Sequence, residues 1–110
     1  MTLDRFPLSS FVCGWFVGRF TPTLLDTGDV EVAIKHYRAG DSEPAHHHKV
    51  AVELTAIVAG RVRMGGEEFG PGEIVRIAPG TAADFAAITD ATTVVVKLPS
   101  VAGDKYPGTP

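Results

Sequence analysis

The sequence predicts an all-β protein made of short antiparallel strands. Twelve glycines and eight prolines interrupt runs that are rich in valine, isoleucine, threonine and phenylalanine. No window shows the sustained helical period of apolar side chains that an amphipathic helix requires. Turn-forming residues recur at short intervals, which is the spacing expected of a β-sandwich or a closed β-barrel.

Roughly nine segments carry the strand pattern, and each ends at a recognisable turn. Their β-branched and aromatic residues favour extended backbone, whereas the Gly-, Pro- and Asp-rich stretches between them favour turns. The predicted strands are 11–17, 30–38, the region around 45–48, 52–58, 61–64, 67–69, 73–78, 83–88 and 92–98. The turn signals between them are RAGDSEP, AGR, GG, FGPG, APGT and TDA.

The two ends of the chain differ from its centre. The segment 11–17, FVCGWFV, is apolar at successive positions. A strand there would be covered on both faces, either by the core or by a second copy of the chain in a dimer. The C-terminal PSVAGDKYPGTP holds too much Pro and Gly to continue a ladder. We therefore expect one domain with N-terminal strands at 1–29, a core at 30–98 and an irregular tail at 99–110.

Length and charge limit the classes of function. The 110 residues suit a single core, and a net charge of -3 argues against nucleic acid as a partner. One cysteine, Cys13, excludes an intramolecular disulfide and fits a reducing, cytoplasmic location. The apolar stretch LSSFVCGWFV is too short to span a bilayer and no clean cleavage site follows it. Neither a membrane anchor nor a signal peptide is expected.

Three consecutive histidines precede one of the apolar strands. In an extended strand, residues two apart point to the same face, so His46 and His48 share a face and His47 points to the other. Glu53 follows His48 at an odd offset, and a bend or a turn is needed to bring its carboxylate back to that face. Two imidazoles and one carboxylate are a ligand set for a divalent transition metal that keeps open positions for water, oxygen or substrate.

The spacing around these residues resembles the first motif of the cupins, G-x5-H-x-H-x4-E-x6-G. Gly40, His46, His48, Glu53 and Gly60 reproduce it in full. The resemblance covers about residues 30–98 and implies a jelly-roll barrel, the cupin double-stranded β-helix, commonly assembled as a homodimer. It also implies that His46, His48 and Glu53 bind a divalent metal (Fe, Mn, Ni or Zn) inside the barrel.

The second cupin motif, G-x5-P-x-G-x2-H-x3-N, is matched only in part. Gly72 and Gly80 supply its glycine frame, but the proline is shifted by one place to Pro79. Ala83 stands at the histidine position and Ala87 at the asparagine position. Because cupins with the full set hold their metal by three histidines and one glutamate, the resemblance leaves the fourth ligand open.

Three candidates for that fourth ligand follow from the sequence. His36 lies in the neighbouring strand and could face the interior. Asp84, one residue past the vacant position, is a competent oxygen ligand but needs a bulge to turn inward. Water needs no irregular backbone and would leave a facial triad of protein ligands, so we favour water.

Other residues are candidates for catalysis. Tyr37 could serve as a general acid or base if a nearby cation lowered its pKa. Arg76, set among apolar neighbours, could hold a carboxylate or a phosphate group, although an exposed strand position accounts for it as well. Asp84 could act as a carboxylate near the metal.

The expected function is that of a metal-binding cupin acting on a small, oxygen-rich molecule. The first hypothesis is an enzyme of the isomerase, epimerase or lyase type, in which the metal stabilises charge that develops on a substrate oxygen. One alternative is a non-catalytic module that binds a sugar-like ligand. The other is an Fe(II) dioxygenase. The fold cannot decide among them because one scaffold hosts many chemistries.

Overall fold

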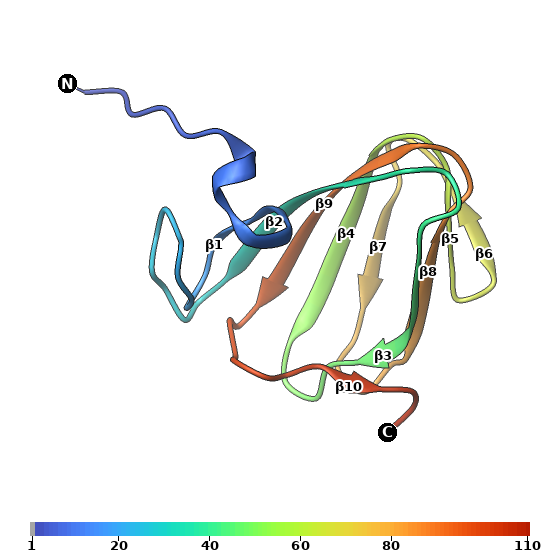
Figure 1. The fold of residues 1–110 in the computed structure, drawn as a ribbon. Coiled ribbons are helices and arrows are strands. Elements are labelled where there is room, and N and C mark those ends of the chain that lie inside the picture. The colour runs from blue at the N-terminus through green and yellow to red at the C-terminus, as the bar shows by residue number, and fades with distance from the viewer. Residues whose placement is uncertain (1) are drawn as a thin grey trace.

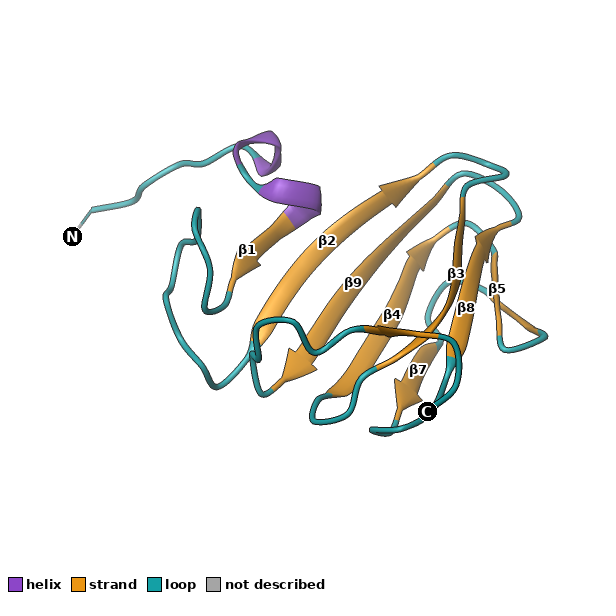
Figure 2. Cartoon of the chain, turned by 60° about the horizontal axis from the view of Figure 1, so that its bottom comes forward, coloured by secondary structure: helices purple, strands orange, loops and turns teal. Residues whose placement is uncertain are grey.

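Two five-stranded antiparallel sheets face each other in a computed structural model that describes residues 2–110 (Figure 1, Figure 2). The predicted all-β jelly-roll architecture is confirmed. The first sheet has the order β1 (Trp15–Val17), β2 (Glu31–Tyr37), β9 (Ala91–Leu98), β4 (Val52–Ala59), β7 (Ile74–Ile77). The second has the order β10 (Tyr106–Pro107), β3 (Ser42–His47), β8 (Ala83–Ala87), β5 (Val62–Met64), β6 (Glu67–Phe69).

The central strand of the first sheet, β9, shows how side-chain alternation sets the two faces. Thr93 and Val95 are buried between the sheets, while Val94 and Val96 point to the outer face. Strand β2 pairs with β9 along its whole length, and Lys35 lies opposite Thr93. Residues of the two strands that share the inner face therefore stand side by side.

The space between the sheets is apolar at one end and polar at the other. The apolar end is filled by a cluster of buried side chains, with Tyr37, Phe69, Val75 and Ile77 packed against it. At the other end His48, Glu53 and Lys97 line a chamber. The cluster that closes the apolar end comprises Ile57, Val62, Met64, Phe85, Ala87 and Ala91.

The structure explains why glycine occupies the two positions that frame the histidine motif, Gly40 and Gly60. Gly60 has φ 80°, and a Cβ there would collide with the carbonyl oxygen of Asp90. Gly40 has φ 91° and donates its N–H to the Ala87 carbonyl at 2.8 Å, which ties the turn between β2 and β3 to the end of β8. Both glycines therefore fix the ends of the strands that carry the histidines and the glutamate.

The N-terminal prediction was wrong in part. Instead of one strand over 11–17, the chain forms two 3-10 turns, Leu8–Ser10 and Val12–Gly14, followed by the short β1. Cys13 and Gly14 both have positive φ, and Gly14 packs against the Ile34 carbonyl so closely that a Cβ would not fit. Extended backbone is impossible there. No helix among residues 2–110 is long and apolar enough to cross a membrane.

The C-terminal segment is more ordered than predicted. Residues 106 and 107 form β10, which pairs with β3 opposite His46 and His47 (Figure 1). Ahead of β10, the buried side chain of Asp104 contacts the turn between β3 and β4. The segment therefore adds a strand to the second sheet and does not merely cover the surface.

Candidate metal centre

Three side chains meet at the polar end of the barrel. One ligand atom from each of His46, His48 and Glu53 lies within 4.8 Å of the other two. The imidazole rings of His46 and His48 are 5.3 Å apart between centroids and nearly perpendicular, at 76°. Both rings thus aim at one point without stacking on each other.

The backbone explains how Glu53 joins the two histidines despite its odd offset. His46 lies near the end of β3, His48 follows the strand directly, and Glu53 is the second residue of β4. The chain reverses over residues 48–51 and enters the opposite sheet. The reversal lets Glu53 face His48 across the interior, with Nε2 and Oε1 3.3 Å apart.

Backbone carbonyls fix the orientation of both imidazoles. The Nδ1 atom of His48 contacts the Asp104 carbonyl oxygen, and the Nδ1 atom of His46 lies 3.3 Å from the Pro44 carbonyl oxygen. Since a carbonyl only accepts, each Nδ1 carries a proton, and each Nε2 is the ring nitrogen that can offer a lone pair to a metal once it is deprotonated. The Thr55 hydroxyl donates to Glu53 Oε2 at 2.9 Å and orients that carboxylate.

Burial and mutual hydrogen bonds shift the pKa values of His46, His48 and Glu53. The hydrogen bond with Glu53 raises the pKa of His48, while burial opposes the rise. Burial tends to raise the pKa of Glu53, but hydrogen bonds from His48 and Thr55 outweigh it, and the pKa is lowered. Burial lowers the pKa of His46. A divalent cation here would displace the proton that His48 and Glu53 share, and the donor set fits such an ion.

Asp104 holds the turn that carries these ligands, and sequence reasoning missed it. Its carboxylate accepts hydrogen bonds from the backbone N–H groups of Lys49 (2.8 Å), Val50 (3.2 Å) and Ala51 (2.9 Å). Burial alone would raise the pKa of Asp104, but these N–H groups outweigh it and lower the pKa. The C-terminal segment therefore positions His48 twice, through the carboxylate and through the carbonyl of one residue.

His47 lies on the other face of β3, as the alternation predicts. Its side chain is buried, its Nδ1 donates to the Gly108 carbonyl at 2.7 Å, and its ring stacks on Tyr106 with centroids 5.4 Å apart. The middle histidine thus anchors the C-terminal strand and does not reach the cluster.

Neither sequence candidate for a fourth protein ligand belongs to the group formed by His46, His48 and Glu53, which corrects those two suggestions. His36 is exposed on the outer face of the first sheet, with Nδ1 3.0 Å from the Thr92 hydroxyl. Asp84 is exposed and accepts a hydrogen bond from the Gly65 N–H at 2.9 Å. The irregularity in the ladder opposite Asp84 lies in β3, which has the extra residue between Glu43 and His46. Ala83 is the direct cross-strand partner of His46, and both Ala83 and Asp84 line a small cavity beside the cluster.

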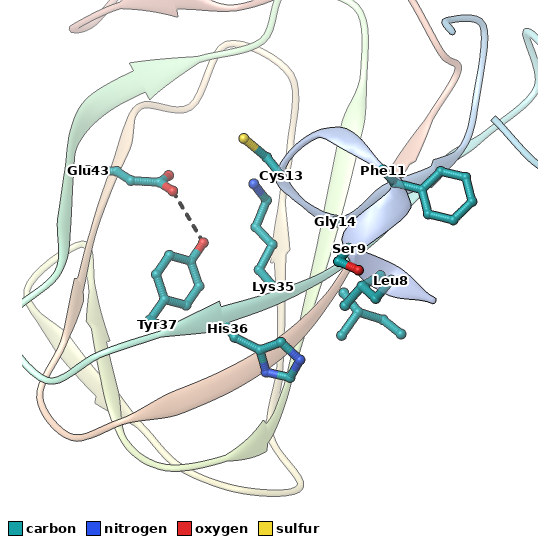
Figure 3. A pocket seen from close by; sticks show the side chains of 10 residues that line it. Leu8, Ser9, Phe11, Cys13, Gly14, Lys35, His36, Tyr37 and Glu43 are labelled. Carbon is teal, nitrogen blue, oxygen red and sulfur yellow. Dashed lines mark hydrogen bonds between the residues drawn. The ribbon is translucent and has the colours of Figure 1, made fainter. Parts of the chain in front are cut away.

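The fold places the two remaining catalytic candidates, Arg76 and Tyr37, on opposite faces of the first sheet. Arg76 is exposed and alternates with the inward-facing Val75 and Ile77, so its guanidinium does not enter the barrel. Tyr37 faces inward and donates its hydroxyl hydrogen bond to Glu43 Oε1 at 3.2 Å (Figure 3). Burial, followed by the charge of Glu43, raises the pKa of Tyr37, so the phenol stays protonated at physiological pH.

Glu43 is the second residue that sequence reasoning missed. It stands three positions before His46, an odd offset that would place it on the opposite face of a regular strand. The register of β3 shifts between these two residues, and the irregularity brings both to the interior. Glu43 lines the same chamber as His46, His48 and Glu53.

The chamber at His46, His48 and Glu53 has a volume of about 140 Å³, and a larger outer pocket of about 570 Å³ adjoins it. Lys35, Tyr37 and Glu43 line both. The 3-10 turns of the N-terminal segment form the other wall of the outer pocket, and Figure 3 shows Lys35 and Tyr37 on one side of β2 with His36 on the other. Lys35, Tyr37 and Glu43 therefore stand between the outer pocket and the chamber.

Comparison with solved structures identifies the fold. A double-stranded β-helix protein from Klebsiella pneumoniae superposes with a TM-score of 0.72 at 18% identity, over 96% of this chain and 92% of that one. The DMSP lyase DddQ from Ruegeria pomeroyi gives 0.72 at 19% identity, over 88% and 51%. A cupin-superfamily sugar phosphate isomerase from Silicibacter pomeroyi gives 0.61 at 20% identity, over 66% and 52%.

These structural similarities establish the architecture of the chain. The chain has the cupin fold, and it spans about half the length of the lyase and of the isomerase. No family model matches the chain, and no curated protein matches it in sequence. Activity must therefore be argued from the site itself.

Proposed function

We propose that the protein is a metal-dependent enzyme that isomerises, epimerises or eliminates from a small oxygen-rich molecule. His46, His48 and Glu53 would hold a divalent transition metal ion (Fe, Mn, Ni or Zn). The observation that carries the proposal is the convergence of these three side chains, with each histidine Nδ1 held by a backbone carbonyl. When bound, such an ion supplies Lewis-acid stabilisation of negative charge on a substrate oxygen.

In this proposal, Glu43 is the general base that transfers the proton. Its carboxylate lines the chamber beside the metal ligands, close to any substrate that reaches them. A carboxylate in this position can take a proton from a carbon next to a polarised carbonyl and return it to the same or a neighbouring atom. Tyr37 holds Glu43 in place by its hydrogen bond and, as a protonated phenol, donates without competing as a base.

Similar folds support a reaction of this class. The lyase and the sugar phosphate isomerase named above share this architecture. The support is at the level of the fold, and the residues at the site carry the rest of the argument.

A second candidate is an Fe(II) oxygenase. Two histidines and one carboxylate form the facial triad that leaves positions for oxygen and substrate. The specific observation in its favour is that Ala83 supplies no fourth donor where it faces His46. Oxygen consumption by the Fe(II)-loaded protein would favour this candidate over proton transfer.

The proposed function is tested by proton exchange. A panel of sugar acids, hydroxy acids and keto acids is incubated in D2O with tag-free protein, and ¹H NMR follows the loss of C–H signals. We expect exchange that disappears on metal removal and slows by about a hundred-fold or more in Glu43→Gln, the loss expected for a general base. Ligand binding that survives complete metal removal, without any exchange, would instead identify a non-catalytic binding module.

We also propose that the protein is a homodimer that buries the outer face of the first sheet. This face is formed by alternate residues of β2, β9, β4 and β7, and Val58 and Ile74 are 55% and 69% exposed on it. A sheet face this apolar is typical of a protein interface. Its apolar side chains are Val32, Ile34, Val52, Leu54, Ala56, Val58, Ile74, Val94 and Val96.

Light scattering of two matched variants tests this interface. We expect Val94→Lys to give monomers and Val12→Lys, in the N-terminal segment, to remain dimeric. The opposite result would move the contact to the N-terminal segment, where the apolar stretch 11–17 first suggested it. A monomeric wild-type protein would refute both versions.

A further inference from the structure

Lys35 presents an unneutralised positive charge to the wall of the chamber. It lies in β2 on the inner face, half-buried, and lines both the chamber and the outer pocket. Lys97, which lines the same chamber, is neutralised by Glu31 at 2.8 Å. Among residues 2–110, Lys35 makes no such ion pair. Partial burial of an unpaired ammonium costs free energy, so it points to a ligand.

Trp15 fixes where the Lys35 ammonium lies. The Nζ atoms of Lys35 and Lys97 stand 5.2 Å and 4.9 Å from the centre of the same indole ring. This shared cation–π platform restrains the flexible Lys35 side chain, while Lys97 is also held by Glu31. The N-terminal strand β1 thus holds a cation at the mouth of the chamber.

Thr93 adds an unpaired hydroxyl next to Lys35. The two residues are direct cross-strand partners on the inner face of β2 and β9. The Thr93 side chain is fully buried and lines the chamber, yet its Oγ1 has no hydrogen-bond partner among the described residues. A buried polar group without a partner is rare in native proteins and calls for an explanation such as a ligand.

The net charge of the chamber indicates the sign of that ligand. Lys97 is neutralised by Glu31, and Glu53 offsets half of the charge of a divalent ion. Glu43 is then outweighed by Lys35 and by Lys105, which also lines the chamber. With the ion in place, the chamber is positive and attracts an anion.

We propose that Lys35 and Thr93 form an anion subsite beside the metal ligands, which receives a carboxylate of the substrate. The Lys35 ammonium and the Thr93 hydroxyl both donate hydrogen bonds to it, while the remaining oxygens of the substrate lie at His46, His48 and Glu53. The chamber volume of about 140 Å³ suits a small acid. The inference rests on the proposed function for the substrate class and for the positive charge that the ion would add, whereas Lys35 and Thr93 themselves need no metal.

The test compares dicarboxylates with their monoamides. Malonate, succinate and glutarate, each against its monoamide, are titrated by NMR into zinc-loaded and metal-free protein, and metal content is measured in parallel. At least one dicarboxylate should bind the zinc-loaded protein about ten-fold more tightly than its monoamide, the gain expected of one charge-assisted hydrogen bond. Lys35→Gln should abolish this preference without changing zinc affinity, and Thr93→Val should weaken it.

A matched control is Lys49→Gln. Lys49 also stacks on an aromatic ring, Tyr106, at 4.1 Å, but it is exposed outside the chamber. This variant should keep the full preference for the dicarboxylate.

The outcomes separate the two proposals. A preference that persists in Lys35→Gln, or no preference in the wild type, overturns the subsite whatever the metal content. A protein that binds none of Fe, Mn, Ni and Zn, but still binds the acids in a Lys35-dependent manner, refutes the proposed enzyme and retains the subsite.

Discussion

The two turns that meet at the polar end of the barrel have different roles. The turn between β3 and β4, with the strand ends beside it, carries the ligands His46, His48 and Glu53, and Asp104 fixes its backbone. The turn between β7 and β8 carries no ligand. It supports the first turn, because the Gly80 N–H donates to the His48 carbonyl at 2.7 Å.

This difference shows that scaffold and ligation can be separated. The second turn keeps the Pro-Gly geometry that places it against His48, and Ala83 still occupies the position opposite His46. Only the donor side chain is missing. The account therefore predicts that changes in the first turn weaken metal binding, whereas the second turn can gain a ligand without being rebuilt.

The largest expected effect removes a ligand from the first turn. His48→Ala should weaken zinc binding by about a hundred-fold or more, because the ion loses a direct ligand. Isothermal titration calorimetry of tag-free protein measures it. The control is His36→Ala, which removes an exposed imidazole on the outer face and should leave zinc affinity unchanged. Equal affinity in both variants would contradict the assignment of the ligands.

The next effect adds a ligand to the second turn. Ala83→His should place a third imidazole opposite His46 and tighten zinc binding by about ten- to a hundred-fold. Asp84→His is the matched control, since the neighbouring side chain points out of the barrel and should add nothing. The comparison between the turns fails if the two variants behave alike.

A smaller effect is expected when the support of the first turn is weakened. Asp104→Asn replaces a buried carboxylate that accepts three backbone hydrogen bonds, so unfolding free energy should fall by about 2 kcal/mol. Zinc affinity should fall by about ten-fold, as for loss of a group that orients a ligand. Chemical denaturation and calorimetry measure the two effects, with the exposed Asp29→Asn as control. An unchanged zinc affinity would show that the turn holds its shape without the C-terminal segment.

The smallest effect is a pH dependence of stability. The pKa of Asp104 is lower in the folded protein than its ordinary value of 3.8. The unfolded chain therefore binds the proton more readily, and this part of the stability is present above pH 3.8 and is lost as the pH falls through the folded-state pKa. Denaturation between about pH 5 and pH 2 should show a steeper loss in the wild type than in Asp104→Asn. Parallel curves would assign the acid sensitivity to other carboxyl groups.

Much of the fold was predictable because its signals are local. Turn residues and β-branched runs placed most strands within a few residues of their observed bounds, from β2 through β9. The alternation of side chains along a strand was sufficient to set His46 and His48 on one face and His47 on the other. Those signals need no knowledge of distant residues.

The missed features depend on irregular backbone or on long-range contacts. Cys13 and Gly14 have positive φ and therefore cannot continue the expected N-terminal strand. An apolar run gives no sequence signal for positive φ. The bulge in β3 turned Glu43 inward against simple alternation. Asp104 contacts backbone groups more than fifty residues away in sequence, and no local pattern marks such a partner.

The most direct test of the central claim is X-ray absorption by the zinc-loaded, tag-free protein. The account predicts one zinc ion per chain with two imidazole nitrogens and carboxylate oxygen among its ligands at about 2.0–2.2 Å. The two-imidazole contribution should disappear in His48→Ala. A zinc shell with no imidazole, or the same shell in wild type and variant, would contradict it.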